Sequence, residues 1–214
     1  EGIAAIFKSY LDGVERAVVE PVRYPIVRKA TEVRRVDECQ DVNQGKLCIG
    51  MRTGKNIEDG CHHIAQLFSE IYGASPTSKL FVNVREKMSL CYFCRSMTNQ
   101  RNGVLMVASG IEFANKEIAE EAILKQLDAI KNGEITLEEL ENAKRSLRNA
   151  YMSIYDSVHS MELWTLNRSL SENYDTPLDE KRKIDGATVD EIVEYAKGIT
   201  LDTIYFLKGE DKNG

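Results

Sequence analysis

Hydrophobic residues at the start of the chain recur with the spacing of a helix. They are Ile3, Ile6, Phe7, Tyr10, Leu11 and Val14. Because this spacing places them on one face, residues 1–17 are predicted to form an amphipathic helix. Pro21 and Pro25 interrupt the pattern that follows. We therefore expect residues 1–25 to be an N-terminal helix and linker from a preceding domain.

Residues 26–214 are expected to form one domain, which begins with an extended, mostly charged arm over residues 26–43. The first clear strand follows at residues 45–52, where hydrophobic residues fall on both faces, as is typical of a central strand. A helix is predicted over residues 58–72, with Gly73 as its C-terminal stop. The period of the pattern thus changes from that of a strand to that of a helix.

Two strands, over residues 89–98 and 104–111, are predicted to form a hairpin. Asn102 and Gly103 lie between them, and this dipeptide is a strong hairpin signal because both residues tolerate a positive φ. A helix over residues 115–132 is predicted next, because its apolar positions again share one face. These positions are Ile118, Ala122, Ile123, Leu127 and Ile130.

Two capping boxes mark helix starts in the last third of the chain. They are Thr136 with Glu139 and Thr188 with Glu191. The apolar stripe of the first helix continues towards Leu170, so a kink or break is expected near residues 157–160. Residues 203–207 are predicted to form a last apolar strand. Elements in this order predict an α+β fold, with a mostly antiparallel sheet covered by helices.

Composition and charge argue against several classes of protein. The 214 residues carry a net charge of −6, whereas a nucleic-acid-binding protein normally has a basic face. No apolar run approaches the roughly 18 residues of a membrane span, so no membrane partner is expected. The first residues do not have the pattern of a secretory leader, and none is expected. Five irregularly spaced cysteines form a poor disulfide framework and suit a reducing, cytoplasmic location. The chain begins with Glu rather than Met, so we expect further sequence upstream.

The stretch SKLFVNVREKMSLCY, residues 78–92, combines a predicted short helix ending near Lys87, a turn and the start of a strand. Arg85 lies near the end of the helix, and Tyr92 follows seven positions later in the strand. An Arg at such a junction can direct several donors at a carbonyl or carboxylate, and a Tyr hydroxyl can add another. The two residues alone favour a simpler interpretation, a surface salt bridge and a half-buried strand Tyr.

The same stretch, written S-x-L-F-x-x-x-R-E-K-x-x-L-x-Y, resembles a hallmark of the C-terminal half of zinc peptidases of the insulinase, pitrilysin and mitochondrial processing peptidase family. The phrase I-x-N-G-x-I-T-x-E-E-L-x-x-A-K, residues 130–144, is similar to the family's entry into its long helix. The resemblance covers residues 45–207, and residues 1–44 match more weakly. It implies the fold of an insulinase-like half-domain, in which Arg85 and Tyr92 hold the substrate backbone near the scissile bond.

The catalytic half of that family uses the zinc motif H-x-x-E-H, which is absent here. The corresponding helix carries His62 and His63 side by side, and adjacent residues on a helix point about 100° apart, so they cannot chelate one ion from one face. No Glu follows at the needed offset, and His159 is distant in sequence. No catalytic or metal-binding residue is therefore expected in this chain, and the resemblance implies that zinc is bound by a companion half. A free-standing metal-binding domain using Cys61, His62 and His63 is a minor alternative.

Two other features invite a chemical interpretation that we do not favour. Cys91 and Cys94 form a C-x-x-C, but positions three apart on a strand point to opposite faces, so they are interpreted as small core and strand residues rather than a redox or zinc pair. Trp164 is interpreted as a helix-packing residue rather than part of a ligand site.

The leading hypothesis is the substrate-binding, non-zinc half of an insulinase-like zinc metallopeptidase. An extended peptide would add as a strand, and a zinc-carrying homologous half, in the same precursor or on a paralogous subunit, would supply the catalytic centre. The alternative is a catalytically inactive scaffold or regulatory subunit of the same family. A homodimer of isolated copies is a further expectation, because the face that meets the other half should be poorly suited to water.

Overall fold

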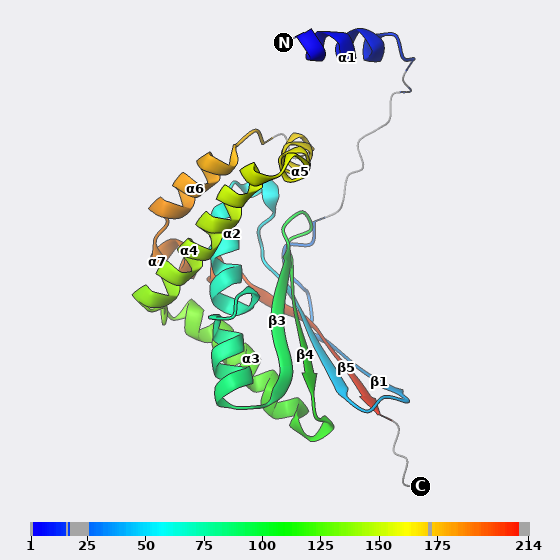
Figure 1. Ribbon diagram of the computed structural model, residues 1–214. Helices are drawn as coiled ribbons and strands as arrows, with labels where there is room; N and C mark the ends of the chain where they lie inside the picture. Colours follow the sequence, from blue (N-terminus) through cyan, green and yellow to red (C-terminus); the bar gives the residue numbers. More distant parts are fainter. Residues whose placement is uncertain (1, 16, 18–25, 171–172, 210–214) are drawn as a thin grey trace.

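The computed structural model describes residues 2–15, 17, 26–170 and 173–209. Its five strands form one sheet in the order β1-β5-β2-β4-β3. The strands are β1 (Arg34–Gln40), β2 (Gly45–Arg52), β3 (Cys91–Asn99), β4 (Val104–Ile111) and β5 (Thr200–Gly209). β1 pairs with β5 in parallel, and every other neighbouring pair is antiparallel (Figure 1). The predicted α+β fold with a mostly antiparallel sheet is confirmed.

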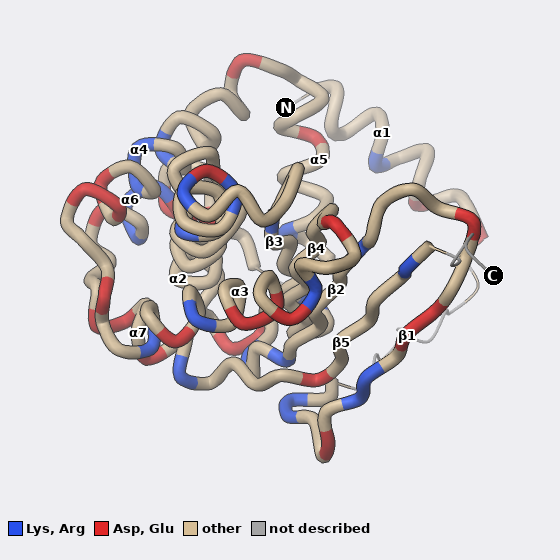
Figure 2. Tube along the Cα trace, turned by 90° about the horizontal axis from the view of Figure 1, so that it is seen from below, with Lys and Arg blue, Asp and Glu red and all other residues tan. Residues whose placement is uncertain are grey.

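The helices other than α1 (Gly2–Asp12) gather on one side of this sheet, and Figure 2 shows α2 (His62–Ser69), α3 (Lys116–Lys131) and α7 (Val189–Lys197) together there. The α-helices are α1 (Gly2–Asp12), α2 (His62–Ser69), α3 (Lys116–Lys131), α4 (Leu137–Ser153), α5 (Val158–Ser169), α6 (Pro177–Gly186) and α7 (Val189–Lys197). The 3-10 and π-helices are η1 (Ile57–Asp59), η2 (Glu70–Ala74), η3 (Leu80–Lys87), η4 (Phe113–Asn115) and η5 (Ile154–Asp156). Across the described part of the chain, every helix is too short or too polar to cross a bilayer.

The hydrophobic core lies between the sheet and these helices. β2 sits between β4 and β5, as expected of a central strand, and directs alternate side chains into the core. These fully buried residues are Leu47, Ile49 and Met51. On the helical side, the rings of Phe68 and Tyr72 stack with centroids 5.4 Å apart. The buried Tyr72 hydroxyl donates to the Ile123 carbonyl oxygen at 3.3 Å, so the core leaves this polar group satisfied.

Gly73 lies within a helix rather than ending one, which corrects the prediction for residues 58–72. That region divides into η1, α2 and the wider η2, which continues through Gly73 to Ala74. A Cβ atom on Gly73 would lie 2.6 Å from Leu80 Cδ1 and 2.9 Å from the backbone nitrogen of Ser96. Glycine is therefore needed here because η2 passes very close to β3, not because a helix must stop.

The predicted break in the long C-terminal helix is confirmed, slightly earlier than expected. α4 ends at Ser153, η5 follows, and the Ser157 side chain caps α5 by accepting from the backbone N–H of Ser160. Both predicted capping boxes are present at the starts of α4 and α7. A third box, Thr176 with Asp179, opens α6, a helix that was not predicted from the sequence. Ile118, predicted to face inward from α3, is 51% exposed.

Two further expectations are revised in detail. The β3–β4 connection is a four-residue loop over residues 100–103, in which Gly103 has a φ of 63° but Asn102 does not have a positive φ. Asn99 Oδ1 accepts from the backbone N–H groups of Arg101 and Asn102, and these bonds shape the loop. At the N-terminus α1 ends at Asp12, and no residue of it is buried. The predicted helix breakers Pro21 and Pro25 lie outside the described residues.

Candidate functional site

β3 is an edge strand, because it pairs with β4 on one side and has no strand neighbour on the other among the described residues. From Phe93 to Asn99 the pairing with β4 is regular. The outward N–H and C=O groups of such an edge can accept another extended chain as an additional strand. The two candidate residues identified from the sequence, Arg85 and Tyr92, lie next to the start of this edge.

Tyr92 is the extra residue of a β-bulge. Cys91 pairs with Ile111 and Phe93 pairs with Gly110, so Tyr92 has no opposite partner. Its side chain is 64% exposed, which excludes the interpretation as a half-buried strand residue. Bulges of this kind redirect a side chain, and here the phenol projects into solvent at the point where the free edge begins.

Arg85 is positioned by the packing of η3. Leu80 and Val84 of this helix are fully buried and fix its orientation, and Ser89, with a φ of 52°, turns the chain back into β3. The guanidinium carbon of Arg85 lies 4.6 Å from the centroid of the Phe81 ring. Its nearest carboxylate is Glu86 at 3.8 Å, an exposed pair that contributes little to stability.

The Arg85 guanidinium keeps most of its donors free. It makes no hydrogen bond within the described residues, and its side chain is 39% exposed. Its positive charge helps to lower the pKa of the Cys91 thiol, so it acts on the residue that precedes Tyr92. No hydrogen bond joins Arg85 to Tyr92 in the described part of the chain. The two residues therefore present separate donors at one end of the β3 edge.

Cys91 and Cys94 lie on the same side of β3, and the prediction that they point to opposite faces is wrong. The bulge at Tyr92 inserts one residue and so reverses the alternation between these positions. Cys94 is 4% exposed, and Cys91 is half-buried beside it. A hydrogen bond from Cys94 lowers the pKa of Cys91 to about 7, while the same bond and burial raise that of Cys94. Both thiols are free, as are the other three cysteines.

His62 and His63 lie in different surroundings. His62 Nδ1 lies 2.7 Å from Gln100 Oε1, and burial lowers the pKa of its imidazole. His63 Nδ1 is buried and has no hydrogen-bond partner among the described residues. Three and four positions after His63, where the second ligand of a helical zinc site would lie, stand Gln66 and the fully buried Leu67. No group of three or more His, Cys, Asp or Glu side chains within the described residues could hold a metal ion, and Cys61 with the two histidines does not form one.

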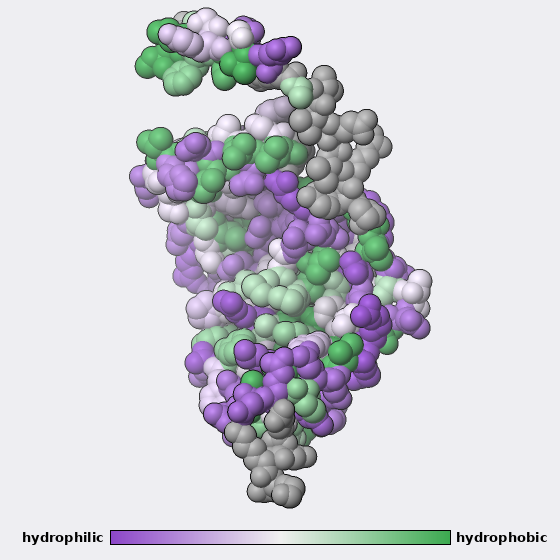
Figure 3. Space-filling view, turned by 90° about the vertical axis from the view of Figure 1, so that its right-hand side faces the viewer, coloured by the Kyte–Doolittle hydropathy of each residue, from purple (hydrophilic) through white to green (hydrophobic). Residues whose placement is uncertain are grey.

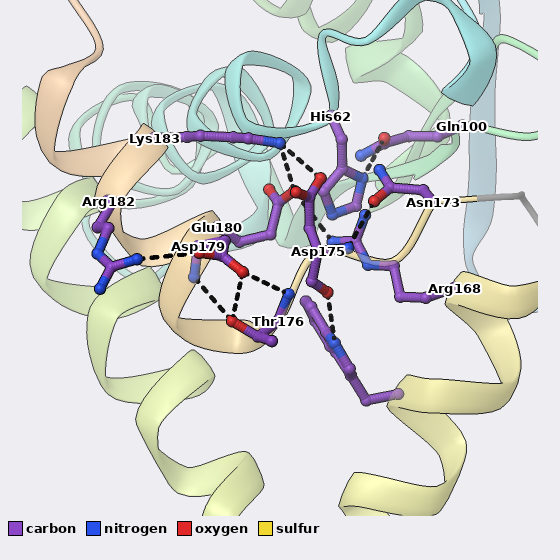
Figure 4. A network of polar contacts seen from close by, with 11 residues as sticks. His62, Gln100, Arg168, Asn173, Asp175, Thr176, Asp179, Glu180, Arg182 and Lys183 are labelled. Carbon is purple, nitrogen blue, oxygen red and sulfur yellow. Dashed lines mark hydrogen bonds and ion pairs between the residues drawn. The ribbon is translucent and has the colours of Figure 1, made fainter.

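A buried charged cluster between α5 and α6 was not predicted (Figure 4). Arg168 Nη2 lies 3.3 Å from Oε1 of the fully buried Glu180, and Lys183 Nζ lies 3.3 Å from the same atom. Lys183 also pairs with Asp175 at 2.6 Å. Trp164 packs against Arg168, with 4.4 Å from the guanidinium carbon to the ring, which confirms its interpretation as a packing residue. No sequence signal marked this cluster, because it joins α5 to α6 and to Asp175 just before α6, and α6 was not predicted.

Comparison with known proteins gives a family match. Residues 1–147 match the model of a family described as the peptidase M16 inactive domain. Two curated proteins of Bacillus subtilis are similar. The probable inactive metalloprotease YmfF is 36% identical over 82% of this chain and 41% of its own length. The uncharacterized zinc protease YmxG is 28% identical over 77% of this chain and 38% of its own length. The chain thus spans about two fifths of the length of these relatives.

Solved structures share the fold. A conserved protein from Enterococcus faecalis superposes with a TM-score of 0.81 at 31% identity, over 89% of this chain and 44% of its own. A protease from Helicobacter pylori gives a TM-score of 0.84 at 19% identity, over 97% of this chain and 52% of its own. A peptidase M16 inactive domain from Pseudomonas fluorescens gives a TM-score of 0.71 at 20% identity, over 97% of this chain and 50% of its own.

Proposed function

Because the chain belongs to the peptidase M16 inactive domain family, we propose that it is the substrate-binding half of a zinc peptidase. In this role it holds an extended peptide while a zinc-carrying companion half, in the same precursor or on a paralogous chain, cleaves it. The observation that carries the proposal is the free β3 edge with the donors of Arg85 and Tyr92 at its start. The described residues do not fit a zinc ion, so every catalytic step is assigned to the companion half.

The peptide binds by adding a strand to β3. Main-chain hydrogen bonds to the outward groups of β3 supply affinity. Arg85 and Tyr92 donate to substrate carbonyl oxygens near the scissile bond and hold the peptide in place for cleavage. Donors positioned in advance of the reaction typically contribute a few kcal/mol to the transition state. Arg85 suits this role because its stacking on Phe81 restrains the guanidinium without using its hydrogen-bond donors.

The test compares this chain alone with the chain mixed with its zinc-carrying partner. We expect no zinc and no peptide hydrolysis from the chain alone, and hydrolysis after mixing. Arg85→Ala should then lower kcat/KM at least tenfold, since it removes a charged donor to the reacting group. Arg145→Ala, which removes an exposed Arg on α4, is the matched control and should leave activity unchanged. Unchanged turnover in Arg85→Ala would contradict the proposed role.

The second candidate function is a catalytically inactive scaffold or regulatory subunit. It is favoured by one observation, that a relative at 36% identity is named a probable inactive metalloprotease. The mixing experiment separates the two functions. A complex that forms with the partner but hydrolyses no peptide would support the scaffold, whereas hydrolysis that depends on Arg85 would support the peptidase half.

A further inference from the structure

The regular part of β3 displays three side chains on the face of the sheet that the helices leave uncovered. Phe93 and Met97 are 41% and 40% exposed, and Arg95 between them is also exposed. The alternating residues Cys94 and Ser96 are buried on the helical side. Figure 3, which views the molecule from the side away from most helices, shows hydrophobic patches set among hydrophilic residues. β3 therefore presents an apolar, a basic and an apolar side chain at every second position.

Arg95 lacks a partner within the described residues, where it makes neither a hydrogen bond nor an ion pair. Its cross-strand neighbour on β4 is Ala108, which offers no polar group. Asp202, a carboxylate of another strand, already pairs with Arg52 at 2.5 Å. A chain with a net charge of −6 thus holds an unpaired cation on its free edge strand. An acidic side chain on a bound partner would therefore complement the charge of Arg95.

The flanking apolar positions are built into the sheet. Met97 lies opposite Met106 of β4, which is 37% exposed on the same face. Phe93 lies over Gly110, where a Cβ atom would come within 2.7 Å of Phe93 Cε1. The absence of a side chain at Gly110 therefore lets the Phe93 ring lie against the sheet. Both apolar residues stand on the strand whose other edge has no strand neighbour among the described residues, and about two fifths of each remains exposed.

We infer that the peptide bound along β3 carries a hydrophobic, an acidic and a second hydrophobic residue at every second position, opposite Phe93, Arg95 and Met97. The inference rests on the proposed addition of the substrate to the β3 edge. Side chains directly opposite on adjacent strands lie on the same face and interact, and apolar pairs and opposite charges are favourable. The pattern reads the same in both directions, so it holds for a parallel or an antiparallel added strand.

The experiment measures binding of fluorescent peptides to the purified chain by anisotropy. The probe peptide contains Leu-Thr-Glu-Thr-Leu within a soluble unstructured sequence, and matched peptides carry Gln or Lys in place of Glu. We expect the Glu peptide to bind at least fivefold more tightly than the Lys peptide. Arg95→Glu should reverse that order, because it changes the sign of the charge opposite the central residue. Arg145→Glu on α4 is the charge-matched control and should leave the order unchanged.

The outcomes separate the inferred residue pattern of the peptide from the addition of a peptide strand to β3. Amide hydrogen exchange of β3 is measured with each peptide, because strand addition protects the outward N–H groups of this strand. Protection with equal affinity for Glu, Gln and Lys peptides, unaffected by Arg95→Glu, would overturn the inferred pattern and leave the proposed function intact. Absence of binding and of protection with every peptide would overturn both.

Discussion

Arg85 and Arg168 make the same two kinds of contact in different surroundings. Each guanidinium lies over an aromatic ring, Phe81 at 4.6 Å and Trp164 at 4.4 Å, and each lies near a carboxylate, at 3.8 Å and 3.3 Å. The Arg85 side chain is 39% exposed, whereas that of Arg168 is 8% exposed. Burial therefore decides what the contacts do. The exposed Arg85 makes no hydrogen bond with its donors among the described residues, whereas the buried Arg168 uses its charge to hold α5 to α6.

The largest expected effect is on stability. Arg168→Ala should lower the free energy of unfolding by about 3 kcal/mol, because it leaves the fully buried Glu180 with Lys183 as its remaining cation and removes the contact of Arg168 with Trp164. Arg85→Ala should change the same quantity by less than about 0.5 kcal/mol, since its ion pair is exposed. Urea denaturation of both variants measures the difference. Similar losses of unfolding free energy in the two variants would show that burial does not distinguish the two arginines.

A smaller loss of stability is expected from Gly73→Ala. This variant tests how closely η2 approaches β3. The added methyl group would collide with the backbone of Ser96 and with Leu80, and overpacking of this kind costs about 1–3 kcal/mol. Gly186→Ala is the matched control, because a Cβ atom there meets no atom within 4 Å and alanine favours the helix. Thermal unfolding should show a lower Tm for the first variant and an equal or higher Tm for the second.

The smallest effect concerns the titration of Cys91, which reports the location of Arg85. A hydrogen bond from Cys94 and, to a lesser degree, the charge of Arg85 lower the pKa of Cys91 to about 7. Alkylation of this thiol by iodoacetamide, followed by mass spectrometry, should therefore rise through pH 7, since the thiolate is the reactive form. Arg85→Ala should move that midpoint upward, and Arg145→Ala should not. An alkylation midpoint that is unchanged in Arg85→Ala would show that the Arg85 guanidinium does not lie near Cys91 in solution.

Local sequence patterns predicted much of the fold and one part of the site. The capping boxes of α4 and α7, the central strand β2 and the end of η3 at Lys87 follow from short-range rules and are confirmed. The motif around Arg85 and Tyr92 was also visible locally, although the roles of these residues stay predictions. Helix α6 was missed because its box uses Asp179 where Glu or Gln is the usual signal.

Other features could not be predicted because they depend on contacts between distant residues. The strict alternation of a strand placed Cys91 and Cys94 on opposite faces, but pairing with β4 created a bulge that reversed this. The sequence pattern around Gly73 indicated a helix stop, but this glycine is needed because β3 packs closely against it. The pairing of Arg168 with Glu180 joins two helices whose relative position no local pattern specifies.

The sequence by itself determined the class of fold, the family resemblance and the absence of an H-x-x-E-H motif, because each of these is carried by residue type and short-range spacing. The tertiary structure decided which charges are buried, which strand is left with a free edge and which side chains face outward from it. These properties depend on strand order and on what packs against each residue. The free edge of β3, with Arg95 unpaired among the described residues, is therefore a feature of the folded chain.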